Sequence, residues 1–233
     1  WHAARMTPAG AKLQVVGAVG RDRSIAALSS LAEKWNGKAN EMPEFELQPA
    51  PEGQKVYFID VPGSKQSVIG VGNRTLRSDE EDFARLGFAN ERLGGGSSAR
   101  LTQLLRIEKG YTYGAYSSLR RFINVVSPWS ARTSVRANVT LESLQLVREQ
   151  IADYGKTFTD EDAEVTRNQV IKRNSRAFET LGAKQSLLNR IARQNLPHDI
   201  VEREQAMLAD MTTADFQRVI GEYLREEDMI WVV

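Results

Sequence analysis

Arg106 and Tyr113 are the residues whose types and spacing best suit them to assist a reaction. An arginine fork can hold a carbonyl or carboxylate group, and a tyrosine hydroxyl can donate to a developing oxyanion. Neither is a base or a nucleophile at neutral pH, so the pair would assist chemistry that other groups perform. Gly110 lies between them and lets the chain reverse, so both could face one cleft. A surface arginine and a half-buried strand tyrosine are the alternative interpretation.

A run of three glycines, Gly94, Gly95 and Gly96, is the second candidate. Glycines that precede a capped helix can bind anions through backbone N–H groups. This run lacks the Lys-Ser/Thr pair of a phosphate-binding loop and the strand that precedes one. A flexible connection between two helices is the other interpretation of the stretch.

Residues that bind metal ions are scarce in this sequence. The chain has no cysteine and two histidines, His2 and His198, which are far apart. Most zinc hydrolases use at least two histidine ligands. The acidic run 79–82 is typical of the first turn of a helix and lacks the spacing of a calcium loop. We therefore predict no metal site in this chain.

The composition is that of an ordinary globular protein. The 233 residues are 41% hydrophobic and 26% charged, with a formal net charge of +1. This balance gives no reason to expect a nucleic-acid partner. No apolar run approaches the ~20 residues of a membrane helix, so we predict no membrane span. The compartment stays open between the cell envelope and the cytoplasm of a bacterium.

The elements that must position the candidate residues are two helices and a strand. A capping box at Ser78–Glu81 predicts a helix that ends at the glycine run. Ser97 or Ser98 would cap a second helix that ends near Gly110. Residues 113–119 then predict a strand. Its predicted partner is the alternating segment 131–139, with residues 127–130 as the loop between them.

The remaining segments complete an α+β pattern. Residues 55–61 and 67–72 flank Pro62-Gly63, which predicts a hairpin or a close antiparallel pair. We expect further strands at residues 12–19 and 228–233, and helices that begin near Arg23, Leu141, Thr159, Gly182 and Thr212. The predicted architecture is a largely antiparallel sheet packed against a layer of helices.

The stretch LGGGSSARLTQLLRIEKGYTYGAYSS (residues 93–118) strongly resembles the pitrilysin/insulinase family of zinc metallopeptidases, which includes proteins like the mitochondrial processing peptidase. The glycine loop, the arginine, the glycine and the tyrosine all fall in the family's register. Supporting matches are MTPAGAKLQVVGAVG (residues 6–20), VYFIDVPGSKQSVIGVG (residues 56–72) and the terminal DMIWVV. The similarity covers nearly the whole chain.

The resemblance implies roles for the candidate residues. In that family two similar halves close around a chamber, and one half carries an H-x-x-E-H zinc motif whose glutamate is the base. The opposite half supplies an arginine and a tyrosine to the substrate, and these match Arg106 and Tyr113. The family's glycine loop, here Gly94–Gly96, is implicated in substrate binding. Tyr111 is also nearby, but its distance in sequence from Arg106 does not match the family's spacing between the arginine and the tyrosine.

This sequence contains no H-x-x-E-H, so the resemblance implies the zinc-free, carboxyl-terminal half of such an enzyme. Zinc is then expected in a partner half, which is either a separate subunit or part of the same polypeptide. The substrate would be a peptide or an unfolded protein, and the chain alone would be inactive. The alternatives are a catalytically inactive scaffold or core subunit, which acts as an interaction module, and a chamber that binds peptides without hydrolysis.

The same resemblance suggests a division of the chain into three parts. Residues 1–37 would be the closing strand and helix that join from a missing amino-terminal, zinc-binding half. Residues 38–54, rich in proline and glutamate, would be a linker, and residues 55–233 would form the carboxyl-terminal domain. The chain starts at Trp1 and stops within an apolar run, so we interpret it as a piece of a longer protein.

Overall fold

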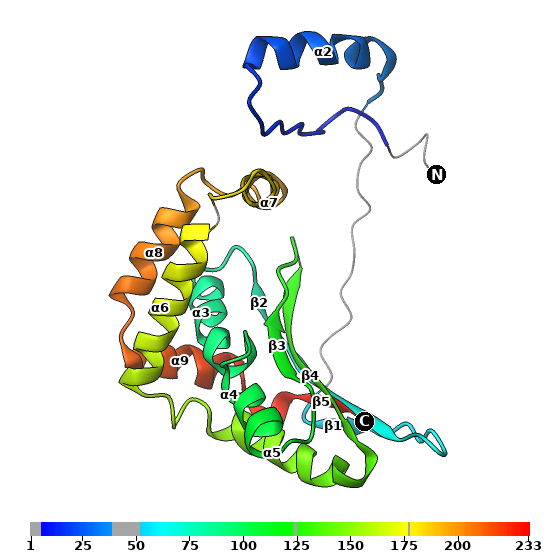
Figure 1. Cartoon of the computed structure of the whole chain (residues 1–233), viewed down its shortest axis with the longest axis vertical. Coiled ribbons are helices and arrows are strands. Elements are labelled where there is room, and N and C mark those ends of the chain that lie inside the picture. Colours follow the sequence, from blue (N-terminus) through cyan, green and yellow to red (C-terminus); the bar gives the residue numbers. More distant parts are fainter. Residues whose placement is uncertain (1–5, 39–51, 124, 177) are drawn as a thin grey trace. The chain divides into compact units, whose positions relative to one another are not determined.

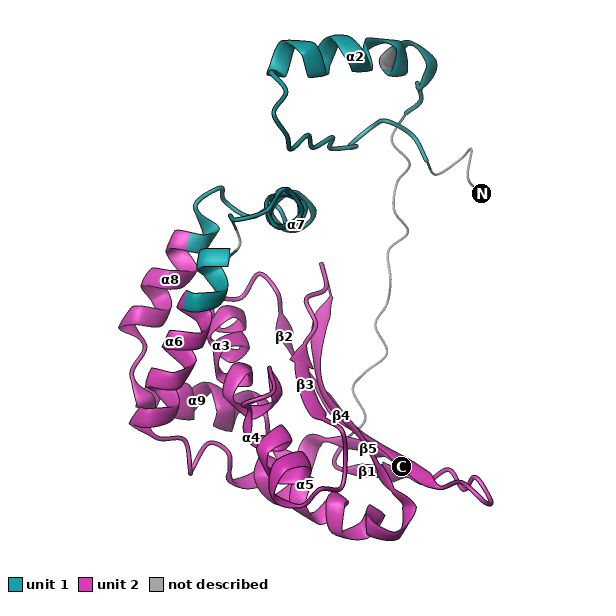
Figure 2. Cartoon of the chain, viewed as in Figure 1, with its two compact units in different colours: residues 1–47, 172–201 teal, residues 48–171, 202–233 magenta. Residues whose placement is uncertain are grey.

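Residues 6–38, 52–123, 125–176 and 178–233 are described in the computed structural model. The chain divides into two units (Figures 1 and 2). Unit 1 comprises residues 1–47 and 172–201, and unit 2 comprises residues 48–171 and 202–233. Most of the predicted linker, residues 39–51, lies outside the described residues. Unit 2 contains every predicted site residue.

Unit 2 is built on a five-stranded sheet in the order β1-β5-β2-β4-β3. Its strands are β1 (Lys55–Tyr57), β2 (Gln66–Arg77), β3 (Ala115–Leu119), β4 (Val126–Arg136) and β5 (Ile230–Val232). Only the β1–β5 pair is parallel within the described sheet. On β2, Ile69 and Val71 are buried while Val68 is exposed, as expected for a sheet with one covered face. The predicted architecture is confirmed.

The predicted hairpin at Pro62-Gly63 is wrong in its pairing. Gly63 has a φ of 79°, which suits the predicted type II turn. However, β5 lies between β1 and β2, and Val233 N donates to Tyr57 O at 2.9 Å. The carboxyl-terminal strand thus uses the backbone groups that a hairpin would have paired. A turn signal between neighbouring segments carries no information on such a long-range insertion.

Residues 127–130, predicted as a loop, are instead part of β4. Trp129 is fully buried, and its indole N–H donates to Asn90 Oδ1 at 2.7 Å. Pro128 has no N–H to donate, and the β2–β4 register shifts beside it, between Arg74 and Arg77. The serines and the proline suggest a turn, but burial of the tryptophan keeps the segment in the sheet.

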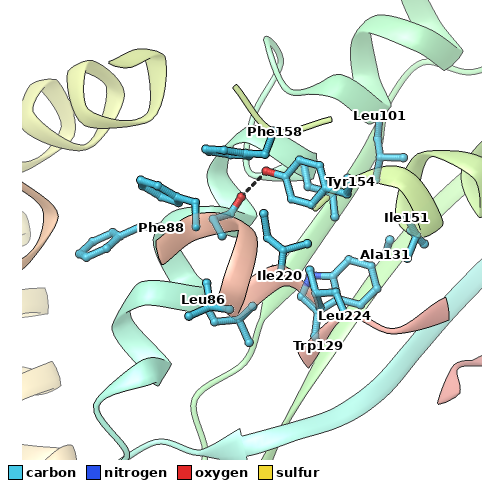
Figure 3. Packing of buried hydrophobic residues seen from close by; sticks show 14 of the residues in the cluster. Leu86, Phe88, Leu101, Trp129, Ala131, Ile151, Tyr154, Phe158, Ile220 and Leu224 are labelled. Atoms are coloured by element: carbon cyan, nitrogen blue, oxygen red, sulfur yellow. Dashed lines mark hydrogen bonds between the residues drawn. The ribbon is translucent and has the colours of Figure 1, made fainter. Parts of the chain in front are cut away.

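Helices cover one face of this sheet (Figure 1). They are α3 (Asp82–Gly94), α4 (Arg100–Thr102), α5 (Thr140–Asp153), α6 (Asp160–Arg176), α8 (Ile200–Asp210) and α9 (Thr213–Tyr223), with the short turns η1 (Gln103–Glu108), η2 (Ala137–Val139) and η3 (Glu226–Asp228). Their apolar faces and the covered sheet face form one core (Figure 3). Within it, the Tyr154 hydroxyl donates to Ala89 O at 2.6 Å. Burial raises the pKa of Tyr154, so its hydroxyl stays neutral.

The predicted caps hold at two of the four helix starts. Thr212 and Asp215 form a reciprocal capping box at α9, and Asp162 N donates to Thr159 Oγ1 at the start of α6. At α3 the predicted box does not form, because Ser78 Oγ donates to Phe122 O instead and the helix begins at Asp82. Neither Ser97 nor Ser98 caps α4, whose N-cap is Ala99. Helix α8 was not predicted from the sequence.

The described part of unit 1 contains α2 (Arg21–Lys34) and α7 (Leu181–Gln194). The predicted strand at residues 12–19 is absent from it. Residues 12–16 instead run along α7, where Lys12 Nζ donates to Ala192 O and Gln14 Nε2 donates to Leu188 O. The described residues of unit 1 include no strand with which this segment could pair. No helix among the described residues is long and apolar enough to cross a membrane.

Candidate functional site

Arg106 lies on a helical turn of unusual geometry. The helix that starts at Arg100 widens after Thr102 into the π-helix η1. Its backbone bonds reach one residue further than those of an α-helix, as in Lys109 N to Leu104 O at 3.0 Å. Leu105 is fully buried and anchors the turn in the core, whereas Arg106 is exposed. Short π-helical turns are frequent at functional sites, because the wider turn re-aims side chains.

A fixed reversal connects this turn to the sheet. Gly110 adopts a φ of 65°, which a residue with a side chain rarely adopts, and this confirms the predicted helix end. Directly after it, Tyr111 N donates to Leu105 O at 2.8 Å. The chain then enters β3 at Ala115. Arg106 and Tyr113 therefore stand on the two sides of one ordered reversal.

The two tyrosines of this reversal have different surroundings. Tyr111 packs against the core, and its hydrogen bond with Glu142 raises the pKa of its hydroxyl. Tyr113 is 89% exposed. Among the described residues, neither the Tyr113 side chain nor the Arg106 side chain has a hydrogen-bond or ion-pair partner. Tyr113 is thus the more exposed of the two tyrosines.

The three glycines are not equivalent in the structure. A Cβ at Gly94 would lie 2.4 Å from Ser117 N on β3, and a Cβ at Gly95 would lie 2.6 Å from Glu91 Cα. Both positions therefore need glycine for close packing. A Cβ at Gly96 would meet nothing within 4 Å. Packing therefore does not explain why residue 96 is a glycine.

The glycine run and the π-helix are joined by a side chain. Gln103, the first residue of η1, donates from Nε2 to Ser97 O at 3.2 Å. Arg92 donates to Ser98 O at 2.9 Å and so fixes the same loop from α3. No hydrogen bond or ion pair among the described residues connects Gly94, Gly95 or Gly96 directly to Arg106 or Tyr113. The structure brings the two candidate groups onto adjoining elements rather than into direct contact.

Two acidic residues of the helix layer, Asp82 and Asp162, are engaged by arginines. Asp82 is held by Arg218, with Nη2 to Oδ1 at 2.7 Å, and by Arg85; these bonds outweigh burial and lower its pKa to about 2. Burial alone would raise the pKa of Asp162, but hydrogen bonds from Arg92 and Arg100 lower it. In the described ranges, no group of three or more His, Asp or Glu side chains could hold a metal ion.

The threonines around Tyr113 were not singled out from the sequence. Thr112 and Thr133 hydrogen bond to each other and to the backbone of Gly114. The available signal was the polar residue at an inward position of β4, between Ala131 and Val135.

A sequence model of the family described as "Peptidase M16 inactive domain" matches residues 1–170. No match was found among curated proteins. Among solved structures, the peptidase M16 inactive domain from Pseudomonas fluorescens is 21% identical with a TM-score of 0.78, over 92% of this chain and 51% of that chain. A protease from Helicobacter pylori is 18% identical with a TM-score of 0.82, over 93% of this chain and 53% of that one.

A third similar fold belongs to a chain of Complex III2 from Candida albicans, with a TM-score of 0.66 and 11% identity. The match covers 91% of this chain and 52% of that chain. These likenesses show a shared fold. The chain spans about half the length of each of these three solved relatives.

Proposed function

Because this chain belongs to the family of inactive domains of M16 peptidases, we propose that it is the substrate-handling half of a zinc metalloendopeptidase. A second half of the protein would hold the zinc ion. The observation that carries the proposal is the exposure of Arg106 and Tyr113 on one ordered reversal, where their side chains have no partner among the described residues. Neither side chain has to break an internal contact to bind a ligand, so binding costs only the rotamer freedom of the side chain itself.

The two side chains would act on different parts of a peptide. The Arg106 guanidinium would orient the substrate through a forked hydrogen bond to a carbonyl or carboxylate group. The Tyr113 hydroxyl would donate to the oxyanion that forms when the peptide bond is attacked. The described residues of this chain include no group that could hold a zinc ion, so under this proposal the ion and the general base would come from the other half.

The glycine run would border the bound peptide. Gly94 and Gly95 pack too closely for any side chain, which supports a role in setting the path of the backbone. Gly96 has open space around its Cα, and this supports a role in letting substrate approach the loop. We propose Gly94–Gly96 as substrate-binding residues on these grounds.

An exposed apolar strip supports the presence of a partner half. The strip consists of Val56, Tyr57, Phe58, Ile59 and Val61, each more than half exposed. β1 is also an edge strand, with backbone groups that β5 satisfies on one side only. Contiguous exposed apolar residues beside an open edge are typical of surfaces that contact another domain or subunit.

We also propose that the chain has three parts, which are defined by their relation to the zinc-binding half. Residues 1–37 would complete the zinc-binding half, residues 38–54 would link the halves, and residues 55–233 would form this half. In support, residues 12–16 are in neither a helix nor a strand, and Leu13 and Val15 are at least half exposed. A segment without a sheet partner in its own unit is suited to complete a sheet elsewhere.

The alternative function is a catalytically inactive scaffold or core subunit that acts as an interaction module. The similar fold in Complex III2 from Candida albicans favours it, because that chain is part of a complex. Under this alternative, Arg106 and Tyr113 would be remnants without an effect on any reaction.

The test is peptide hydrolysis by the complete protein, with both halves present. Its cleavage of a pool of unstructured peptides is compared with that of residues 1–233 alone, with and without 1,10-phenanthroline. We expect cleavage by the complete protein alone, and its loss when the chelator removes the metal. Binding without cleavage under all conditions would contradict the peptidase role.

A further inference from the structure

The backbone around Tyr113 is held by hydroxyl groups rather than by the sheet. β3 begins at Ala115, which pairs with Thr133 of β4. Residues 112–114 therefore precede the ladder of strand hydrogen bonds. Thr112 folds back on this segment, where its Oγ1 accepts from Gly114 N at 3.1 Å and lies 3.0 Å from Gly114 O. Tyr113 is the central residue of this small closed turn.

Thr133 ties the turn to the centre of the sheet. Its side chain points to the covered face of β4 and is only 5% exposed. Thr133 Oγ1 lies 3.1 Å from Thr112 Oγ1 and 3.0 Å from Gly114 O. β4 is hydrogen bonded on both sides, to β2 and to β3, so it is a rigid support for this contact.

Three of these four hydrogen bonds can be made at once, because the single proton of the Thr133 hydroxyl goes either to Thr112 Oγ1 or to Gly114 O. When the Thr133 hydroxyl donates to Thr112 Oγ1, the Thr112 hydroxyl is free to donate to Gly114 O. Thr112 Oγ1 then also accepts from Gly114 N. In this arrangement both threonine hydroxyls and the N–H and carbonyl groups of Gly114 have a partner. Loss of the Thr133 hydroxyl would remove the link between the turn and β4.

We propose that Thr133 is a positioning residue, which fixes the Thr112–Gly114 turn and thereby aims the Tyr113 hydroxyl. This inference rests on the proposed function of Tyr113 as an oxyanion donor. A donor of this kind must be held in place before the reaction, because small displacements of a reacting group cost about a hundredfold in rate. Tyr113 has no partner of its own among the described residues, so its aim depends on the backbone that carries it.

The test uses the complete protein and the variant Thr133→Val, which replaces the hydroxyl by a methyl group. We expect kcat to fall by about tenfold to a hundredfold, and KM to change by less than about threefold, because substrate contacts remain. Thr133→Ser keeps the hydroxyl and should restore kcat to within about threefold of the parent value. Hydrogen exchange at Gly114 N should become faster in the valine variant and not in the serine variant.

A double variant separates positioning from a purely structural role. In a Tyr113→Phe background, adding Thr133→Val should cause no further loss of kcat, since both changes act through the same hydroxyl. Should Thr133→Val fail to fold, Thr112→Val removes the other hydroxyl of the turn, and the same results are expected of it.

A valine variant with parental kcat, or an independent loss in the double variant, would overturn the inference. Parental kcat in Tyr113→Phe itself would overturn the proposed function instead. Loss of kcat in Tyr113→Phe without any loss in Thr133→Val would remove only the positioning role. These results distinguish the failure of the inference from the failure of the function on which it rests.

Discussion

Tyr111 and Tyr113 form a matched pair at the scale of single residues, because they are two positions apart and differ in what surrounds the hydroxyl group. Tyr113→Phe in the complete protein should lower kcat by about a hundredfold to a thousandfold, the usual effect of losing one oxyanion donor. Its stability should not change, because the side chain is exposed. Initial-rate kinetics and thermal unfolding measure the two effects.

The control is Tyr111→Phe. This variant loses the hydrogen bond with Glu142, so we expect a small loss of stability and a kcat close to the parent value. Parental turnover in Tyr113→Phe, or equal losses in both variants, would show that the reaction does not use Tyr113 as proposed.

At the scale of elements, the glycine run offers a test of packing. Gly94→Ala would place a Cβ 2.4 Å from the backbone of β3, so α3 and β3 would have to move apart. We expect a loss of about 1–3 kcal/mol in the free energy of unfolding, as for other overpacked sites. Gly96→Ala should leave stability within about 0.5 kcal/mol of the parent, because its Cβ meets nothing. Urea titration of both variants measures the difference.

The two variants also test the proposed role in substrate binding. Gly96→Ala should raise KM for peptides while the protein stays folded. If it leaves KM unchanged, Gly96 is not part of the substrate site.

The contact between α3 and α9 predicts a dependence of stability on pH. Asp82 at the start of α3 pairs with Arg218 of α9, and its pKa in the folded protein is about 2 against an ordinary value of 3.8. A lowered folded pKa stabilises the fold above the unfolded pKa, and this contribution is lost as pH falls through the folded one. Asp82→Asn should therefore lower the free energy of unfolding by about 1 kcal/mol at pH 7.

The difference between Asp82→Asn and the parent should shrink as pH falls from about 4 through 2, because the Asp82 carboxyl becomes protonated around its folded pKa of about 2. Denaturant unfolding at pH 7 and near pH 2 measures the decrease. Glu81→Gln is the control, since this mostly exposed carboxylate pairs with Arg85 alone and should contribute less. A difference that does not vary with pH would exclude the ion pair as its cause.

Local signals predicted those elements that depend on neighbouring residues. The capping box at Thr212–Asp215 and the left-handed Gly110 are set by residues within one turn, so their patterns are visible in the sequence. The position of β5 between β1 and β2 depends on contacts from the far end of the chain. Trp129 lies in β4 because its side chain is buried in the core, which is also a long-range effect. The π-helix that carries Arg106 has no sequence signature of its own.

In the candidate site, too, local patterns were visible in the sequence and long-range contacts were not. Tyr113 was preferred to Tyr111 from the register of a resemblance, and the exposure of the two side chains is consistent with that choice. The role of Thr133 could not be predicted from spacing, because its contact with Thr112 exists only when β3 and β4 pair. A polar residue at an inward-facing strand position is the sequence feature that could indicate such a positioning residue.

At the scale of the whole molecule, this chain supplies only part of a reaction. Its described residues present a donor and a cation, and no group of three or more histidine or acidic side chains among them could hold a metal ion. Its length is about half that of the similar solved chains. Activity would therefore depend on a second half, which would bring the metal ion and the base to Arg106 and Tyr113.

The zinc content of the complete protein, purified without exposure to chelators, tests this account most directly. Elemental analysis by mass spectrometry of the assembled halves should find about one zinc ion for each copy of this chain, since a catalytic centre of this kind uses one ion. A complete protein without zinc would contradict the peptidase role and favour the scaffold.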